Sequence, residues 1–260
     1  MGVAAAVLVA VVGLLVLARG RTAAPPSVDD AIARQGGVGT TSVPAPSGPA
    51  RPSPGVYTAT GRGTERLSLA PAAKSQGPTL PVAVTLDGDA CYVVRVDQNT
   101  DHWQSWRYCR QAGGTLAELG GQTFQRTDIV VMTIDNTSTF VCEPPSPVLV
   151  AGAPVGSVAD QRCTGTSSAQ AGEAISAGPQ TVVADEDLAI GSTTVRTRHV
   201  HQERTLSGAQ RGTERADTWW TADGLPVRNE RRVEVASPSP IGDVTYSEEG
   251  SWQLDSITPR

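Results

Sequence analysis

Two histidines and a glutamate alternate along one predicted strand, in the segment His199-Val200-His201-Gln202-Glu203. Side chains two residues apart on a strand share a face, so His199, His201 and Glu203 would lie together. Imidazole nitrogens and carboxylates bind zinc on several β scaffolds, which gives these three residues as candidate metal ligands. A solvated outer strand is the alternative, favoured by three flanking arginines that would repel a cation: Arg196, Arg198 and Arg204.

The four cysteines are the second group of residues that could do chemistry: Cys91, Cys109, Cys142 and Cys163. An even number of cysteines in an exported domain predicts disulfides. Sequential pairing would close two loops of similar size, each stabilising the fold by about 3 kcal/mol in the chain-entropy treatment. Both crossed pairings stay open. The separations are long and lack Cys-x-x-Cys spacing, which disfavours a structural zinc site.

Other signatures of catalysis are missing from the sequence. It has no Gly-x-Ser-x-Gly elbow, no His-Glu-x-x-His pair and no glycine-rich phosphate loop. The net charge is −5 without a basic patch, which excludes the usual electrostatics of nucleic-acid binding. We therefore expect a binding or structural protein without catalytic residues or cofactor. A metal-dependent enzyme using His199, His201 and Glu203 is the alternative.

An apolar segment opens the chain. Residues 2–18 are uncharged and consist almost wholly of Ala, Val, Leu and Gly, which is close to the shortest helix that spans a bilayer. We expect residues 1–21 to form an uncleaved, single-pass signal-anchor, although a cleaved signal peptide is the alternative. Positive charges tend to stay on the cytoplasmic side of a membrane, so Arg19 and Arg21 on its C-terminal side favour a cytoplasmic location for the rest of the chain. The cysteines and the following linker favour a cytoplasmic membrane protein with its C-terminal domain outside the cytoplasm.

A linker rich in Pro, Ser, Gly and Ala is predicted for residues 22–55. Within it, Ser27 is placed to cap a short helical turn that has Asp29 and Asp30 at its start and ends near Arg34.

Residues 56–260 are typical of a mainly β domain, or of two subdomains (56–170 and 171–260). Segments rich in β-branched and aromatic residues alternate with Gly, Pro, Asp and Asn, which predicts antiparallel sheets or a meander with a half-barrel or sandwich-like shape. The expected strands are 56–60, 65–69, 82–86, 92–96, 103–109, 129–134, 138–142, 181–183, 193–206, 213–220, 227–236 and 244–254. One short helix is expected at 115–119.

Strand alternation also predicts which side chains share a face. It places Glu214 with Trp220 on one face of 213–220, and Arg231 with Val233 on one face of 227–235. We expect Trp220 to be buried and Trp219 to be the more exposed of the pair, and we expect Trp103 and Trp106 to lie on opposite faces. With two Phe in the chain, a modest filled core is favoured over a large apolar cavity.

The segment from Trp219 to Arg228, Trp-Trp-Thr-Ala-Asp-Gly-Leu-Pro-Val-Arg, resembles a hairpin of the extracytoplasmic β half-barrels of the LolA and LppX type. From Pro54-Gly55-Val56-Tyr57-Thr58 to the C-terminus, the chain is similar to actinobacterial membrane-anchored proteins of the cell envelope. These resemblances imply a lipid or another apolar envelope molecule as ligand, or an envelope protein as partner. The membrane would be contacted through the N-terminal helix.

Overall fold

The computed structural model describes residues 23–36, 50–129, 132–240 and 242–260. The predicted anchor at 1–21 lies outside these residues, as does the linker segment 37–49. Among the residues that the structure describes, no helix combines the length and the apolar character needed to cross a membrane.

The described chain contains one helix, α2 (Val28–Arg34), followed by thirteen strands. The strands are β1 (Gly55–Leu67), β2 (Lys74–Gln76), β3 (Thr79–Asp87), β4 (Cys91–Asn99), β5 (His102–Arg110), β6 (Leu116–Ile129), β7 (Met132–Leu149), β8 (Val158–Ser167), β9 (Gln170–Ile190), β10 (Thr193–Gly208), β11 (Arg211–Trp220), β12 (Pro226–Ser237) and β13 (Val244–Leu254). The mainly β, antiparallel prediction is confirmed.

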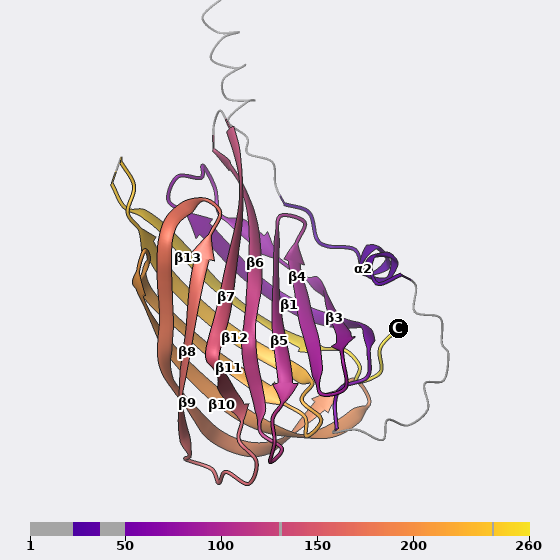
Figure 1. Cartoon of the computed structure of the whole chain (residues 1–260). Coiled ribbons are helices and arrows are strands. Elements are labelled where there is room, and N and C mark those ends of the chain that lie inside the picture. Colours follow the sequence, from indigo (N-terminus) through magenta and orange to yellow (C-terminus); the bar gives the residue numbers. More distant parts are fainter. Residues whose placement is uncertain (1–22, 37–49, 130–131, 241) are drawn as a thin grey trace, which may run out of the picture.

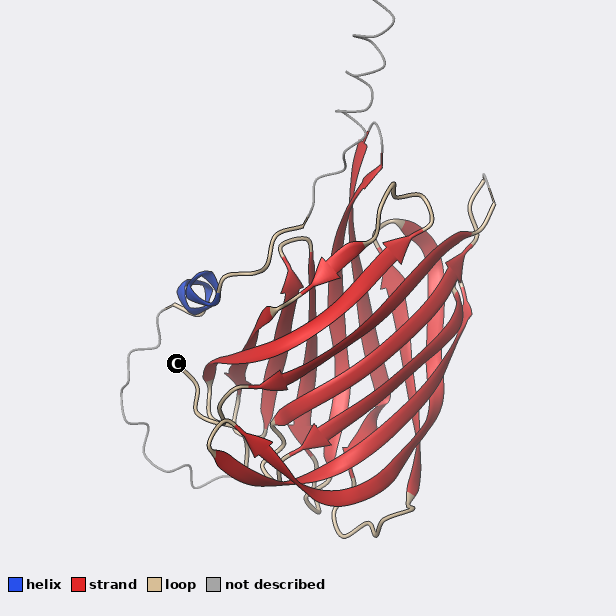
Figure 2. Ribbon diagram, turned by 180° about the vertical axis from the view of Figure 1, so that it is seen from behind, coloured by secondary structure: helices blue, strands red, loops and turns tan. Residues whose placement is uncertain are grey.

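The strands form one sheet that closes on itself (Figures 1 and 2). Each strand pairs antiparallel with its neighbours, and β13 returns to pair with β1 from Ala59 opposite Leu254 to Leu67 opposite Tyr246. Both β2 and β3 pair with β1, β2 at Gly63–Glu65 and β3 at Gly55–Thr60, so they lie end to end and together occupy one strand position. The result is a closed barrel with twelve strand positions. The expected half-barrel or sandwich is wrong because the β13–β1 pairing removes the free edges, and strands from both 56–170 and 171–260 share the sheet.

The barrel has two unlike ends. At the end where β1 begins and β13 finishes, called here the core end, the interior is filled by apolar side chains, among them Tyr57, Tyr92, Leu116, Ile190 and Leu254. The Tyr92 hydroxyl donates to the Gly224 carbonyl at 2.5 Å and so joins β4 to the connection between β11 and β12 across this end. Its pKa is raised, chiefly by burial. The other end, called the hairpin end, carries the long β6–β7 hairpin at the top of Figure 1.

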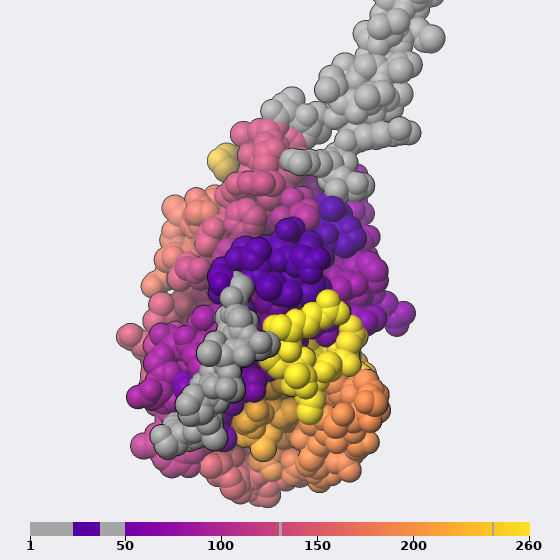
Figure 3. Space-filling view, turned by 90° about the vertical axis from the view of Figure 1, so that its right-hand side faces the viewer, coloured from indigo at the N-terminus to yellow at the C-terminus, as the bar shows by residue number. Residues whose placement is uncertain are grey.

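The predicted helical turn is confirmed in α2. The Ser27 hydroxyl accepts a hydrogen bond from the Asp30 amide at 3.2 Å, which caps the helix. Ala31 is buried against the barrel, where α2 contacts β1 and β3, and Arg34 forms an ion pair with Asp97. Figure 3 shows α2 and the C-terminal residues on the same face of the molecule.

The short helix expected at 115–119 is wrong, since Leu116–Glu118 belong to β6. A register shift between Glu118 and Gly120 interrupts the pairing of β6 with β7. Gly120 has a φ of +135°, and a Cβ atom there would lie 2.1 Å from the Phe140 carbonyl oxygen. Only glycine fits so close to the neighbouring strand, and pairing on both sides overrides the local helix preference.

Both disulfides follow the sequential pairing. Cys91 and Cys109 sit opposite each other on β4 and β5, and a second bridge joins Cys142 on β7 to Cys163 on β8. Backbone pairing between β7 and β8 covers only 138–141 with 164–167. Beyond the second bridge, side chains take over the connection.

Two hydrogen bonds show how the wall continues there. The Ser146 hydroxyl donates to the Arg162 carbonyl at 3.0 Å, and the Gln161 amide donates to the Pro147 carbonyl at 2.7 Å. The disulfide and these bonds hold a stretch of β7 whose prolines lack backbone donors.

The tryptophans in the strands β5 and β11 follow strand alternation. Trp106 lines the interior, while Trp103 lies outside under Arg95, whose guanidinium is 4.1 Å from the ring centre, as predicted for opposite faces. Trp219 and Trp220 are almost equally buried, at 7% and 5% exposure, so the expected difference between them is not found. His199 stacks on the outer Trp219 ring at 4.2 Å and covers it.

Candidate functional site

A layer of charged side chains crosses the barrel interior between its two ends. Its members occupy inward-facing positions on seven strands, and we call them the charged layer: Glu65, His102, Glu118, Arg204, Glu214, Arg231 and Glu248. His102 is fully buried, and Glu65, Glu118, Arg204 and Glu248 are also classed as buried. Burying charges is costly unless they are paired, so their contacts decide what the layer can do.

Two arginines contact three of the four carboxylates of the layer. Arg204 Nη2 lies 2.8 Å from Glu118 Oε2, and Arg231 Nη2 lies 3.1 Å from Glu214 Oε1. Arg231 Nη1 also approaches Glu248 Oε2 at 3.9 Å. Burial alone would lower the pKa of both guanidinium groups, but the neighbouring carboxylates outweigh it and raise the pKa. Both arginines therefore stay charged.

Glu248 of β13 accepts several hydrogen bonds. Its carboxylate accepts hydrogen bonds from Gln76 at 3.2 Å, Gln104 at 3.3 Å and the Tyr246 hydroxyl at 3.1 Å. Burial raises its pKa, but the charges of Arg231 and His102 outweigh burial and hold the pKa below the usual value. The Glu248 carboxylate is thus ionised at neutral pH.

The layer separates two cavities. A small one of about 110 Å³ lies between the layer and the apolar core. A larger one of about 390 Å³ extends from the layer to the loops of the hairpin end. The expectation of a filled core therefore describes the core end, whereas the hairpin half encloses space.

The lining of the larger cavity is mixed. Its apolar wall includes Leu67, Phe140, Leu206, Val233 and Val235. Neutral polar side chains line the rest, among them Thr123, Gln125, Asn136, Ser138, Ser176 and Gln210. Charged groups gather at its floor, so the cavity has an apolar wall and a charged base.

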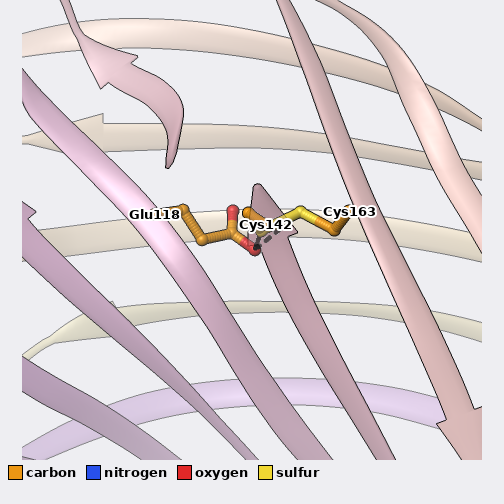
Figure 4. Close-up of side chains that lie close together, drawn as sticks. All are labelled: Glu118, Cys142 and Cys163. Atoms are coloured by element: carbon orange, nitrogen blue, oxygen red, sulfur yellow. Dashed lines mark hydrogen bonds between the residues drawn. A yellow bond between two sulfur atoms is a disulfide. The ribbon is translucent and has the colours of Figure 1, made fainter. Parts of the chain in front are cut away.

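Several buried polar atoms at this floor lack partners among the described residues. The Ser176 hydroxyl and Arg231 Nε have no hydrogen-bond partner. Glu118 Oε1 faces Cys142 Sγ at 3.8 Å and Cys163 Sγ at 3.9 Å, as Figure 4 shows. These sulfurs form a disulfide and carry no hydrogen, so they cannot donate to the carboxylate.

The predicted metal ligands lie on the outer face of β10. His199 Nε2 and His201 Nδ1 converge on Asp217 Oδ1 of β11, at 2.7 and 3.0 Å. Glu203 instead accepts a hydrogen bond from Arg215 Nε at 3.0 Å. The structure thus brings the two histidines to an aspartate that sequence reasoning did not single out, and directs the glutamate to an arginine.

Among the described residues, the one tight group of potential metal ligands is Glu118 with Cys142 and Cys163. Metal binding by cysteine requires a thiolate, and these two sulfurs are oxidised to a disulfide. The group therefore offers a single carboxylate as ligand.

Sequence reasoning missed the charged layer as a site, although part of its signal was visible. Alternation placed Glu214 beside Trp220 and Arg231 beside Val233, and a charge on a face that is otherwise buried marks an interior ion pair. Arg204 was interpreted as an outer charge that repels cations, but it points inward with Val200 and Leu206. A scan against protein-family models and searches of curated proteins and solved structures found no match. The resemblances to half-barrel carriers and envelope proteins therefore stay predictions.

Proposed function

We propose that this chain is a non-catalytic binding protein that holds a small amphiphilic molecule inside the barrel. The observation that carries the proposal is the cavity of about 390 Å³ between the charged layer and the hairpin end. Ligand pockets typically have such volumes, with mostly apolar walls and a few polar groups that fix orientation. An apolar part of the ligand would lie along Leu206, Val233 and Val235, and its polar part would reach the charged floor.

The width of the barrel supports this function. Eight strands give an interior that side chains just fill, and the diameter grows with strand number. A barrel with twelve strand positions encloses more space, and the cluster of large aromatic and aliphatic side chains fills it at the core end. The hairpin half of the barrel is thus available to a ligand.

A location outside the cytoplasm is part of the proposal. Two disulfides are expected in oxidising compartments and are rare in the cytosol. Residues 1–21 would anchor the protein to the cytoplasmic membrane, and the ligand would then be a lipid or another apolar molecule of the cell envelope.

Filling the cavity tests the function. Val235 lines it, whereas the adjacent Glu234 is exposed on the outer face of the same strand. We expect Nile red to bind the purified protein with increased fluorescence, and we expect Val235→Trp to weaken that binding by about tenfold or more. The matched control Glu234→Trp should bind normally. Absent binding, or equal binding by both variants, would contradict a ligand site inside the barrel.

A further inference from the structure

One oxygen of the buried Glu118 carboxylate has no hydrogen-bond donor within the part of the chain that the structure describes. Oε2 is held by Arg204, but Oε1 meets only the sulfurs of the Cys142–Cys163 disulfide (Figure 4). A buried carboxylate oxygen without a hydrogen bond loses its hydration, and no protein contact compensates that free-energy cost. Because Glu118 lines the large cavity, a molecule bound there could supply the missing donor.

Ser176 supplies a second, independent sign of a ligand group at the same place. Its side chain is 2% exposed, its hydroxyl has no partner among the described residues, and it lines the same cavity. Ser176 is the cross-strand partner of Cys163, and directly opposed side chains lie about 5 Å apart. The hydroxyl and Glu118 Oε1 therefore both lie next to Cys163 of this disulfide.

The charge of the layer favours a cation. Four carboxylates, those of Glu65, Glu118, Glu214 and Glu248, face two guanidinium groups and the His102 imidazole. Even with His102 protonated, the layer carries an excess of negative charge. Charges interact more strongly in a poorly solvated interior than in water, so this excess would attract a cationic group and repel an anionic one.

We propose that the polar end of the bound amphiphile is a primary ammonium group held by Glu118 Oε1 and Ser176 Oγ. This assignment rests on the proposed function. An ammonium has three donors and no acceptor, which suits a carboxylate oxygen and a hydroxyl that both lack donors. Its bond to Glu118 is charge-assisted, the stronger kind. The tail extends along Leu206 and Val233 toward the hairpin end.

An anionic head group fits less well. The unpaired Arg231 Nε could bind one, but the same guanidinium already faces Glu214 and Glu248. A carboxylate placed there would meet two like charges. A neutral hydroxyl would satisfy the geometry at Glu118 without using its charge, so the alcohol is the informative comparison.

Three probes with the same tail separate these head groups. Decylamine, decanol and decanoate are titrated against Nile red bound to the purified full chain at neutral pH. We expect decylamine to bind about tenfold tighter than decanol and decanoate to bind weakest. Equal or tighter binding of decanol or decanoate would overturn the ammonium assignment while leaving a binding function. If none of the three displaces Nile red, the proposed function fails with it.

Variants locate the recognition. Glu118→Gln combined with Arg204→Gln removes both charges together, and we expect it to abolish the preference for decylamine over decanol. Ser176→Ala removes only a hydroxyl and should reduce that preference about threefold. Glu203→Gln, which neutralises an exposed carboxylate on the outer face of β10, should leave it unchanged.

Circular dichroism and thermal melting verify that each variant is folded. Ser176→Ala decides the assignment if the double variant does not fold. A folded double variant, or a Ser176→Ala protein, with the full preference for the amine would overturn the proposal.

Discussion

Removing the charge of Arg204 tests whether the layer is held by paired charges. The side chain is buried, and its guanidinium contacts Glu118 Oε2 at 2.8 Å and Gln161 Oε1 at 3.1 Å. Methionine reproduces the flexible aliphatic stem of arginine without the charged guanidinium group, so Arg204→Met retains part of the packing. It leaves the Glu118 carboxylate buried without any nitrogen or oxygen donor among the described residues.

The expected cost follows from those contacts. Breaking a buried ion pair from one side costs about 3–5 kcal/mol, because the remaining charge is uncompensated. Removing both charges in Glu118→Met/Arg204→Met eliminates that penalty, and replacement of a buried pair by apolar residues is often nearly neutral. We therefore expect the double variant to be more stable than Arg204→Met by about 2 kcal/mol or more.

Urea unfolding with the disulfides intact, followed by tryptophan fluorescence, measures both free energies. Arg215→Met is the matched control, because its partner Glu203 is exposed and surface ion pairs contribute about 0–1 kcal/mol. Two results would refute the reasoning. One is a cost for Arg204→Met no larger than that of the control, and the other is a double variant as unstable as both single changes added together.

Two further predictions concern pH and location. The pKa of Glu248 is lowered in the folded state, so its ionised form stabilises the fold above its unfolded pKa of about 4.5, and this contribution is lost as the pH falls through the lower, folded pKa. Glu248→Gln should reduce the difference in the free energy of unfolding between neutral pH and pH of about 3. If urea unfolding showed the same loss of stability at acid pH for the variant and the original protein, it would contradict the lowered pKa. Separately, a reporter active only in the cytoplasm, fused after Arg260, should be silent; strong activity would contradict the proposed location.

Local sequence patterns predicted much of the strand content and several side-chain directions. Alternation along 213–220 and 227–235 placed Glu214 on the face of Trp220 and Arg231 on the face of Val233, and in the structure these four side chains line the interior. This works because the two-residue period belongs to a strand wherever its partners lie. The capped turn at Ser27 was visible for a similar reason, since its hydrogen bond spans three residues.

Closure of the barrel could not be predicted from such patterns. It depends on the pairing of Ala59 with Leu254, residues from opposite ends of the domain, and alternation specifies faces rather than partners. The bulge after Glu118 was equally hidden, because Leu116–Leu119 has a helix-like composition and the close approach of Phe140 determines the outcome. The candidate site was missed because its members come from seven strands that become neighbours only on closure.

The charged layer also explains how a wide barrel is filled with few large apolar residues. The chain has only two Phe, and its apolar side chains fill the core end. Farther along, long polar side chains reach across the interior: Arg204 of β10 binds Glu118 of β6, and Gln104 of β5 binds Glu248 of β13.

These contacts join strands that are not neighbours in the sheet, so they fix the distance between opposite walls of the barrel. Buried ion pairs are seldom the most stabilising way to fill a core. Their value here is that they stop the apolar core at a defined level and present a charged floor to the cavity above it. An apolar layer at the same level would support the walls but would give an amphiphile no group to recognise.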